Sequence, residues 1–292
     1  MAVSDSERQK AFTIAATALA LICIGAWFGS AAKGAEKNDV PNFAASPVTA
    51  WVPSRAAGDN FLPPPGGPGP VVDDPAHPYA PNQGTAGQAA FHVADLNNPI
   101  LKPWAKAQMK KANDDVLAGK IPFTARERCW PGGVPDFDVY ERDRPVFWIQ
   151  SPKEVVIVNE HDEQLRHIYL NVPHSANVKP SWYGDSVGHF EGDTLVVDTI
   201  GLNDKTFVDN YRTPHTTQLH VIERFRLMDG GRVLHADITV DDPGAFNMAW
   251  SAVQRWQRNN RGPMEETTCA ENNENFYNYD VRPIPQADRP DF

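Results

Sequence analysis

The sequence predicts a mainly β fold, in which antiparallel strands close into a β-barrel or form one strongly curved sheet, with one helix packed on the N-terminal side. Three observations lead to this prediction. From residue 134 onward, short strand-like runs are separated by turn signals. Connections of two to four residues between these runs indicate antiparallel hairpins, because parallel strands need long crossovers. Strands and helices do not alternate along the chain, which excludes a Rossmann or TIM fold.

The helix is predicted between Pro103, which suits a first helical turn, and Gly119, which suits a stop. The intervening stretch "WAKAQMKKANDDVLA" contains no helix breaker. We expect the helix to pack on a sheet through one stripe of its surface. That stripe comprises Trp104, Ala105, Gln108, Ala112 and Val116.

Seven or eight strands follow the helix, enough for an antiparallel sheet to curl on itself. Closing or strongly bending the sheet removes its exposed edges, so the predicted architecture is lipocalin-like in outline. The predicted strands lie at residues 146–151, 154–160, 165–171, 181–191, 194–200, 217–228, 233–240 and 246–258.

Composition favours one acidic, well-packed domain, which we place at residues 100–292. The chain has 292 residues, 41% of them apolar, and its eight Trp residues can help to fill a core. The formal net charge is −10, and nucleic-acid binding depends on Lys and Arg neutralising phosphates. A nucleic-acid partner is therefore not expected.

The N-terminus predicts export. Residues 11–28 are almost continuously apolar, with Arg8 and Lys10 before them, which is the pattern of a signal peptide. Ser30 and Ala32 suit a cleavage after residue 32. Because the apolar run is nearly long enough to span a bilayer, residues 1–32 are predicted to be either a signal peptide or an uncleaved anchor. The rest of the chain is expected in the periplasm or outside the cell, with membrane contact only through this segment if it is not cleaved.

Residues 33–99 differ in composition from the rest of the chain. Eleven of the 26 prolines fall between residues 41 and 81. Because proline removes backbone donors and favours extended geometry, this segment is predicted to be a linker, or an arm laid over the domain, without a core of its own.

The cysteines offer one disulfide. Cys129 and Cys269 lie in the mature part of the chain, whereas Cys23 lies in the apolar run. In an oxidising compartment two such thiols usually pair, so we predict a Cys129–Cys269 disulfide. The alternative is two independent buried thiols.

Several motifs resemble a family of exported bacterial proteins common in soil genomes. The motifs are "GHFEGDTLVV", "GLND", "PHTT" and "ERF", together with the earlier "ERCWPGGVP", and they cover about residues 99–275. The family pattern is S-x-G-x-W-E-G-D-T-L-V-V, G-F-N-D, P-H-S and E-R-F. This chain departs from it with Phe190 for Trp, Leu202 for Phe and Thr216 for Ser. The resemblance implies export and a mostly β domain, and adds no reaction.

Histidines gather in the predicted sheet. His189 and Glu191 share one face of a strand, a spacing that a cupin uses for two metal ligands, but the remaining cupin pattern is absent. We therefore predict a surface ladder there and no metal. Seven of the nine histidines lie between residues 161 and 235: His161, His167, His174, His189, His215, His220 and His235.

The candidate catalytic residues are His215, Asp204 and Glu223. His215 sits in a loop that leads into a strand, and Asp204 is placed to orient it as a base. Glu223 alternates with apolar residues in "LHVIERFRL", which turns it into the barrel as an acid or an electrostatic partner. The structural alternatives are a turn histidine that caps backbone groups and a buried Glu–Arg or Glu–Trp bond. His235 and Asp237, on the neighbouring strand, are expected near Glu223.

These residues predict an exported enzyme that acts on a small, partly apolar organic molecule by acid–base chemistry of the lyase, isomerase or hydratase type. No cofactor is expected. The alternatives are a non-catalytic protein that binds an apolar ligand and a subunit of envelope assembly. Trp148 and Trp256 can contribute to the apolar wall of the barrel. The residues predicted to contact the substrate are Trp182, His189, Tyr211 and Trp250.

Overall fold

The computed structural model describes residues 40–44, 50–54, 60–80, 91–120, 122–125, 129–139, 145–160, 164–260, 263–267 and 269. The chain divides into a unit of residues 1–39 and a unit of residues 40–292, and the described residues belong to the second. The predicted signal peptide or anchor at residues 1–32 lies outside the described residues. Within the described ranges, no helix combines the length and the apolarity needed to cross a membrane.

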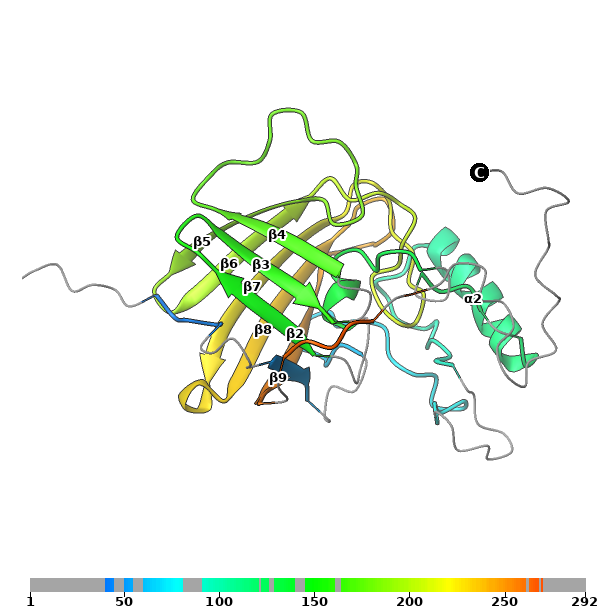
Figure 1. Ribbon diagram of the computed structural model, residues 1–292. Coiled ribbons are helices and arrows are strands. Elements are labelled where there is room, and N and C mark those ends of the chain that lie inside the picture. Colours follow the sequence, from blue (N-terminus) through cyan, green and yellow to red (C-terminus); the bar gives the residue numbers. More distant parts are fainter. Residues whose placement is uncertain are drawn as a thin grey trace, which may run out of the picture. The chain divides into compact units, whose positions relative to one another are not determined.

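The strands form a closed β-barrel in the order β1 to β9, so the predicted mainly β barrel is confirmed. Neighbours along the chain are neighbours in the barrel, and β1 closes it by pairing with β9 (Figure 1). The strands are β1 (Ala50–Pro53), β2 (Val146–Gln150), β3 (Glu154–Asn159), β4 (Gln164–Leu170), β5 (Asp185–Glu191), β6 (Thr194–Ile200), β7 (His220–Met228), β8 (Val233–Asp241) and β9 (Trp250–Asn259).

Turn residues set the hairpins where the sequence predicts them. Gly192 has a φ of 62° in the turn between β5 and β6, a backbone conformation that glycine adopts without strain. The β7–β8 turn likewise contains the short 3-10 helix η4 (Asp229–Gly231), with Gly230 at a φ of 64°. Glycine at these positions lets each pair of strands reverse within a few residues.

The closing strand β1 was not predicted. It has four residues, ends in proline and lies in the Pro-rich segment, so it carries little strand signal. Its Trp51 is fully buried, and the indole nitrogen donates to the backbone oxygen of Phe43 at 3.0 Å. Beyond β1, the arm continues along the same edge of β9, because Leu62 and Val253 exchange two backbone hydrogen bonds of 2.9 Å. The barrel is therefore closed by the segment that the sequence presents as a linker or arm.

One pair of strands departs from the all-antiparallel expectation. β4 and β5 are parallel, and their ladder pairs only Tyr169 with Val187 and Leu170 with Gly188. A long connection at residues 171–184 makes this pairing possible. The first half of β4 pairs with β3 but not with β5, and on that open side it is contacted by side chains such as the Tyr183 hydroxyl, which donates to Gln164 Oε1.

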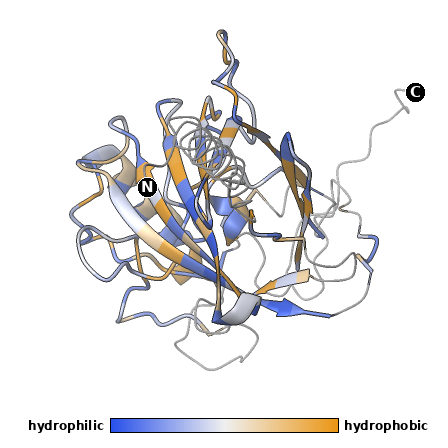
Figure 2. Cartoon of the chain, turned by 90° about the vertical axis from the view of Figure 1, so that its left-hand side faces the viewer, coloured by the Kyte–Doolittle hydropathy of each residue, from blue (hydrophilic) through white to orange (hydrophobic). Residues whose placement is uncertain are grey.

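The barrel interior follows the alternation of each strand. On β8 the inward residues are fully buried, and those on β7 are buried as far as Phe225, whereas the residues between them are more exposed. Figure 2 shows this alternation as hydrophobic and hydrophilic bands along the strands. Aromatic rings fill part of the interior, with Trp148 and Phe225 5.0 Å apart between ring centroids. Burial of these apolar side chains is the main stabilising term of the fold.

The predicted helix is confirmed, but its predicted buried stripe was partly wrong. Helix α2 spans Pro103–Leu117, and Gly119 follows with a φ of 75°. Trp104 is 41% exposed. The buried residues are Ala105, Met109, Asn113 and Val116. The difference arises because Asn113, which a hydrophobic pattern disregards, bonds both the backbone nitrogen and the oxygen of Ala94 at 2.9 Å and so ties the helix to the preceding segment.

The predicted disulfide is present. Cys129 and Cys269 are bonded, with their Cα atoms 5.6 Å apart and a sequence separation of 140. Near Cys269, Glu265 donates its backbone N–H to Glu160 Oε2 at 3.1 Å, next to the end of β3. The bond therefore joins the segment before β2 to the segment after β9.

Candidate functional site

The most unusual group inside the barrel is a fully buried ion pair. Strand β7 turns Glu223 inward between Val221 and Phe225, as its alternation predicts, and Glu223 is completely inaccessible to solvent. From β4, the fully buried Arg166 donates from Nη1 to Glu223 Oε1 at 2.8 Å and from Nη2 to Oε2. This is the bidentate geometry in which guanidinium and carboxylate bind most strongly.

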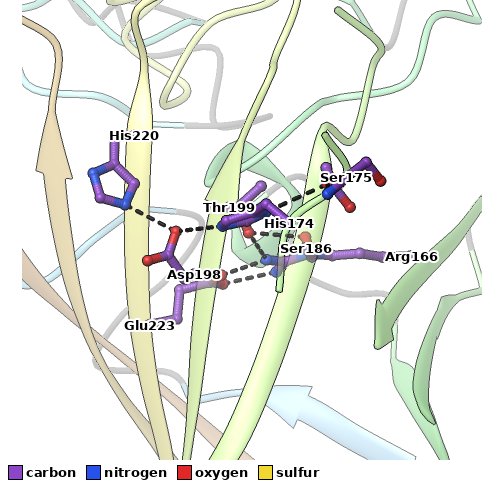
Figure 3. Close-up of polar contacts among 9 residues, drawn as sticks. Arg166, His174, Ser175, Ser186, Asp198, Thr199, His220 and Glu223 are labelled. Atoms are coloured by element: carbon purple, nitrogen blue, oxygen red, sulfur yellow. Dashed lines mark hydrogen bonds and ion pairs between the residues drawn. The ribbon is translucent and has the colours of Figure 1, made fainter. Parts of the chain in front are cut away.

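Two hydroxyl groups complete the surroundings of Arg166. Its Nη2 also donates to Thr199 Oγ1 at 3.0 Å, and Thr199 Oγ1 lies 2.8 Å from Ser186 Oγ. Figure 3 shows these side chains converging from β4, β5, β6 and β7 on the inner side of the sheet. The hydroxyl groups satisfy part of the guanidinium, as burial of a charged group requires.

A second carboxyl group, that of Asp138, lies beside this ion pair and comes from a segment that is not a strand. The 3-10 helix η2 (Asp136–Asp138) is buried over its whole length. Gln254, on the inner face of β9, donates from Nε2 to the backbone oxygen of Asp138 at 3.1 Å and fixes η2 against the barrel. The Asp138 side chain faces both Glu223 and Arg166. One buried arginine therefore lies beside two buried carboxyl groups, and we call Asp138 and Glu223 the acid pair.

The electrostatics of the acid pair favour the protonated form of Asp138. Burial raises the pKa of Asp138 well above its ordinary value, and the negative charge of Glu223 raises it further, against a smaller opposing effect of Arg166. For Arg166, burial alone would lower the pKa, but the charge and hydrogen bonds of Glu223 outweigh burial and raise it. Both effects favour a neutral Asp138 beside the Arg166–Glu223 ion pair.

Some buried polar atoms in this region lack a partner. Among the described residues, Asp138 Oδ2, Arg166 Nε and the indole nitrogen of Trp148 make no hydrogen bond. An ionised Asp138 would leave Oδ2 without a donor, whereas a protonated carboxyl group can donate to Glu223. Unpaired buried polar atoms are rare in proteins and are often found where a water or a ligand binds.

A second polar cluster lies on the outer side of the same strands. Asp198, next to Thr199 on β6, points outward, and its Oδ1 lies 3.0 Å from His174 Nε2 and 2.9 Å from His220 Nε2 (Figure 3). Asp185 Oδ2 accepts the backbone N–H of Ser175 at 2.7 Å. This cluster holds the 171–184 connection against the barrel wall. Across the described part of the chain, no group of three His, Cys, Asp or Glu residues is arranged to hold a metal ion.

His215 is buried, and both its ring nitrogens are bonded within its own loop. Nε2 lies 3.0 Å from Thr206 Oγ1, and Nδ1 lies 3.1 Å from the backbone oxygen of Thr216. Burial lowers the pKa of His215, although the Thr216 carbonyl and the charges of Asp242 and Asp204 oppose this. Asp204 is exposed, and it affects the pKa of the His215 imidazole through its charge. The observed hydrogen bonds of His215 are those of a turn histidine, and those of Glu223 go to Arg166.

The same loop also contains a buried carboxyl group, that of Asp209. It accepts the backbone N–H of Tyr211 at 2.9 Å and the hydroxyl of Thr213 at 2.9 Å. Burial raises its pKa to about 6, and the hydrogen bonds from Thr213 and Tyr211 limit that rise. Asp209 thus braces the turn from within.

The four residues predicted to contact substrate are distributed over separate surroundings. Trp182 is half-buried and lies 5.4 Å from the ring of Trp130. His189 is exposed on the outer face and bonds Glu191 at 3.2 Å. The buried ring of Tyr211 lies 5.1 Å from that of His92. The buried Trp250 packs with Phe61 and Phe246 at 6.4 and 5.8 Å.

The expectation that His235 and Asp237 approach Glu223 was wrong. They share a face of β8 and bond each other at 2.9 Å, but this face is the outer one. In the register, Glu223 is opposite Ile238, one residue out of step with Asp237. A one-residue offset in a strand moves a side chain to the other face of the sheet.

The two charged residues beside Glu223, Arg166 and Asp138, were not predicted. Arg166 was open to prediction, because in "QLRHIYL" it alternates with the buried Ile168 and Leu170 and so shares their face. Asp138 had no such signal, since η2 lies in an irregular segment without periodicity. The chain matches no family model, and neither curated proteins nor solved structures show significant similarity to it.

Proposed function

We propose that this protein is an exported enzyme that catalyses proton transfer on a small, partly apolar organic molecule, of the lyase, isomerase or hydratase type. The observation that supports it is the acid pair of Asp138 and Glu223 on one arginine inside the barrel. Structural roles explain a single buried ion pair. A third ionisable group buried against that pair lowers the stability of the fold, and groups perturbed in this way are concentrated at functional sites.

In this proposal Asp138 is the catalytic residue. A carboxyl group that keeps its proton near neutral pH can donate it to a carbonyl, alkene or leaving hydroxyl group of the substrate, and can then take a proton back from another atom of the same molecule. No net proton is consumed in an isomerisation by this route. Glu223 and Arg166 are positioning residues, because they set the affinity of Asp138 for its proton.

Solvent deuterium incorporation tests this function without a known substrate. A panel of small enolisable and unsaturated carbonyl compounds is incubated with the protein in D2O and followed by NMR. The Asp138→Asn substitution is expected to lower the rate of exchange by about 10²–10⁴-fold, the usual contribution of a general acid or base. The matched control is Asp209→Asn, which also removes a buried aspartate of raised pKa but lies in the 201–219 loop. Equal rates in the wild-type and Asp138→Asn proteins would contradict the proposal.

One observation favours a second candidate function, that of a ligand carrier. The indole nitrogen of Trp148 is buried beside Phe225 without a partner in the described part of the chain, which suits a bound molecule with a hydrogen-bond acceptor. The carrier function would be supported if a compound that co-purifies with the protein, identified by mass spectrometry, is released chemically unchanged after incubation.

A further inference from the structure

A cavity lies at the β7–β8 turn, away from the acid pair. It has a volume of about 420 Å³ and is lined by Asp229, Arg232, Val233, Gln257, Arg258 and Asn260, and we call it the hairpin pocket. The strand from Glu223 to Met228 covers roughly 17 Å at 3.4 Å per residue. The hairpin pocket is therefore separate from the acid pair, and a ligand bound there would be independent of the proposed function.

Arg258 is held in place within the hairpin pocket. Its guanidinium group lies 4.8 Å from the ring centroid of Trp51, a cation–π contact that fixes the side chain. Its backbone N–H donates to the backbone oxygen of Arg232 at 2.9 Å, which joins the two arginines across β8 and β9. Among the described residues, the buried Nε of Arg258 has no hydrogen-bond partner. Because this Nε is covered, a ligand in the pocket would meet the Nη groups of Arg258, and a guanidinium held in place suits an oxyanion.

The charges of the lining select the kind of anion. Two arginines and one aspartate, Asp229, leave one net positive charge in a chain whose net charge is −10. Arg232 Nε donates to the Asp229 backbone oxygen at 3.1 Å, so this arginine is also oriented by the turn. A single negative charge balances such a lining, whereas a phosphate dianion would leave an excess beside Asp229. The amides of Gln257 and Asn260 add polar surface that suits hydroxyl groups.

We propose that the hairpin pocket binds a small organic monoanion through its carboxylate, with Arg258 as the principal ligand-binding residue. The carboxylate accepts from the guanidinium groups of Arg258 and Arg232. The volume is in the range of small-molecule sites, which are usually about 300–1,000 Å³.

Lactate is the probe that tests the proposal, because it has one carboxylate and one hydroxyl group. Titration of the ¹⁵N-labelled protein with lactate should give saturable shifts of the amides at residues 229–233 and 257–260, and lactamide, which lacks the charge, should give none. Inorganic phosphate should bind more weakly than lactate. Arg258→Gln should weaken lactate binding at least tenfold, and Arg258→Lys, which keeps the charge but loses the bidentate geometry, should weaken it less.

The control for a general charge effect is Arg224→Gln. Arg224 lies on the outer face of β7 and pairs with Glu191. Its substitution by glutamine removes one positive charge, as Arg258→Gln does. This variant should bind lactate as the wild type does. The proposal is overturned if Arg224→Gln and Arg258→Gln lose affinity equally, if lactamide competes with lactate, or if no saturable shifts occur at these residues.

Discussion

Replacing Arg166 with methionine is expected to lower the free energy of unfolding by about 3–5 kcal/mol, the usual cost of removing one partner from a buried ion pair. Arg166 and Glu223 are both completely buried and joined by two hydrogen bonds. Without the guanidinium, the carboxylate must remain charged in an apolar interior or take up a proton, and either outcome costs free energy. Urea unfolding followed by tryptophan fluorescence measures the loss.

Two further variants separate the charge effect from packing. Arg224→Met removes an arginine from an exposed pair with Glu191, so it should cost less than about 1 kcal/mol. Arg166→Met combined with Glu223→Gln removes both charges and should recover a substantial part of the loss. If Arg166→Met costs no more than Arg224→Met, the Arg166–Glu223 pair is not buried in the folded protein.

Breaking the disulfide is expected to have an effect of similar size. A bond between residues separated by 140 positions restricts the unfolded chain, and the entropy model gives roughly 5 kcal/mol for a loop of this length. The free energy of unfolding should therefore fall by up to that amount when Cys129 and Cys269 are both changed to serine.

Chemical reduction provides the matched comparison. Wild-type protein treated with a phosphine reductant should unfold at the same urea concentration as the untreated double serine variant, because both lack the same bond. The double serine variant should not respond to the reductant. Equal stability of oxidised and reduced wild-type protein would contradict the entropic account of this bond.

The barrel could be predicted from the sequence because the residue patterns that indicate strands and turns are local. β6, at Thr194–Ile200, lies between a Gly-Asp turn and a Gly-Leu loop, and its predicted and observed bounds agree. β1 was not readable, since four residues in a Pro-rich segment gain their strand geometry from β9 and β2 and not from their own propensity. The parallel contact of β4 with β5 also depends on tertiary packing alone.

The candidate site was predictable only in part. Alternation placed Glu223 inside the barrel, and the structural alternative of a Glu–Arg bond is the one observed. The predicted base His215 lies in a different, self-contained set of hydrogen bonds with Thr206 and Thr216. Asp138 enters the site from a 3-10 helix whose position is fixed by contacts distant in sequence, such as that with Gln254, and no local pattern encodes such contacts.

The protonation state of Asp138 is the central claim, and it fixes the sign of a pH effect. A carboxyl group whose pKa is raised by folding binds its proton more tightly in the folded state than in the unfolded state, where the pKa is about 3.9. Its contribution to stability is therefore fully present below that value and is lost as pH rises through the folded pKa.

The most direct test is a carboxyl-carbon NMR titration of protein labelled with ¹³C-aspartate, with Asp138→Asn used to assign the resonance. We expect the Asp138 carboxyl group to remain protonated well above the range of an ordinary aspartate, and its midpoint to fall when Glu223→Gln removes the neighbouring charge. A midpoint near about 4 that does not respond to Glu223→Gln would contradict the claim, because Asp138 would then be an ordinary carboxylate and not the proton donor of an acid pair.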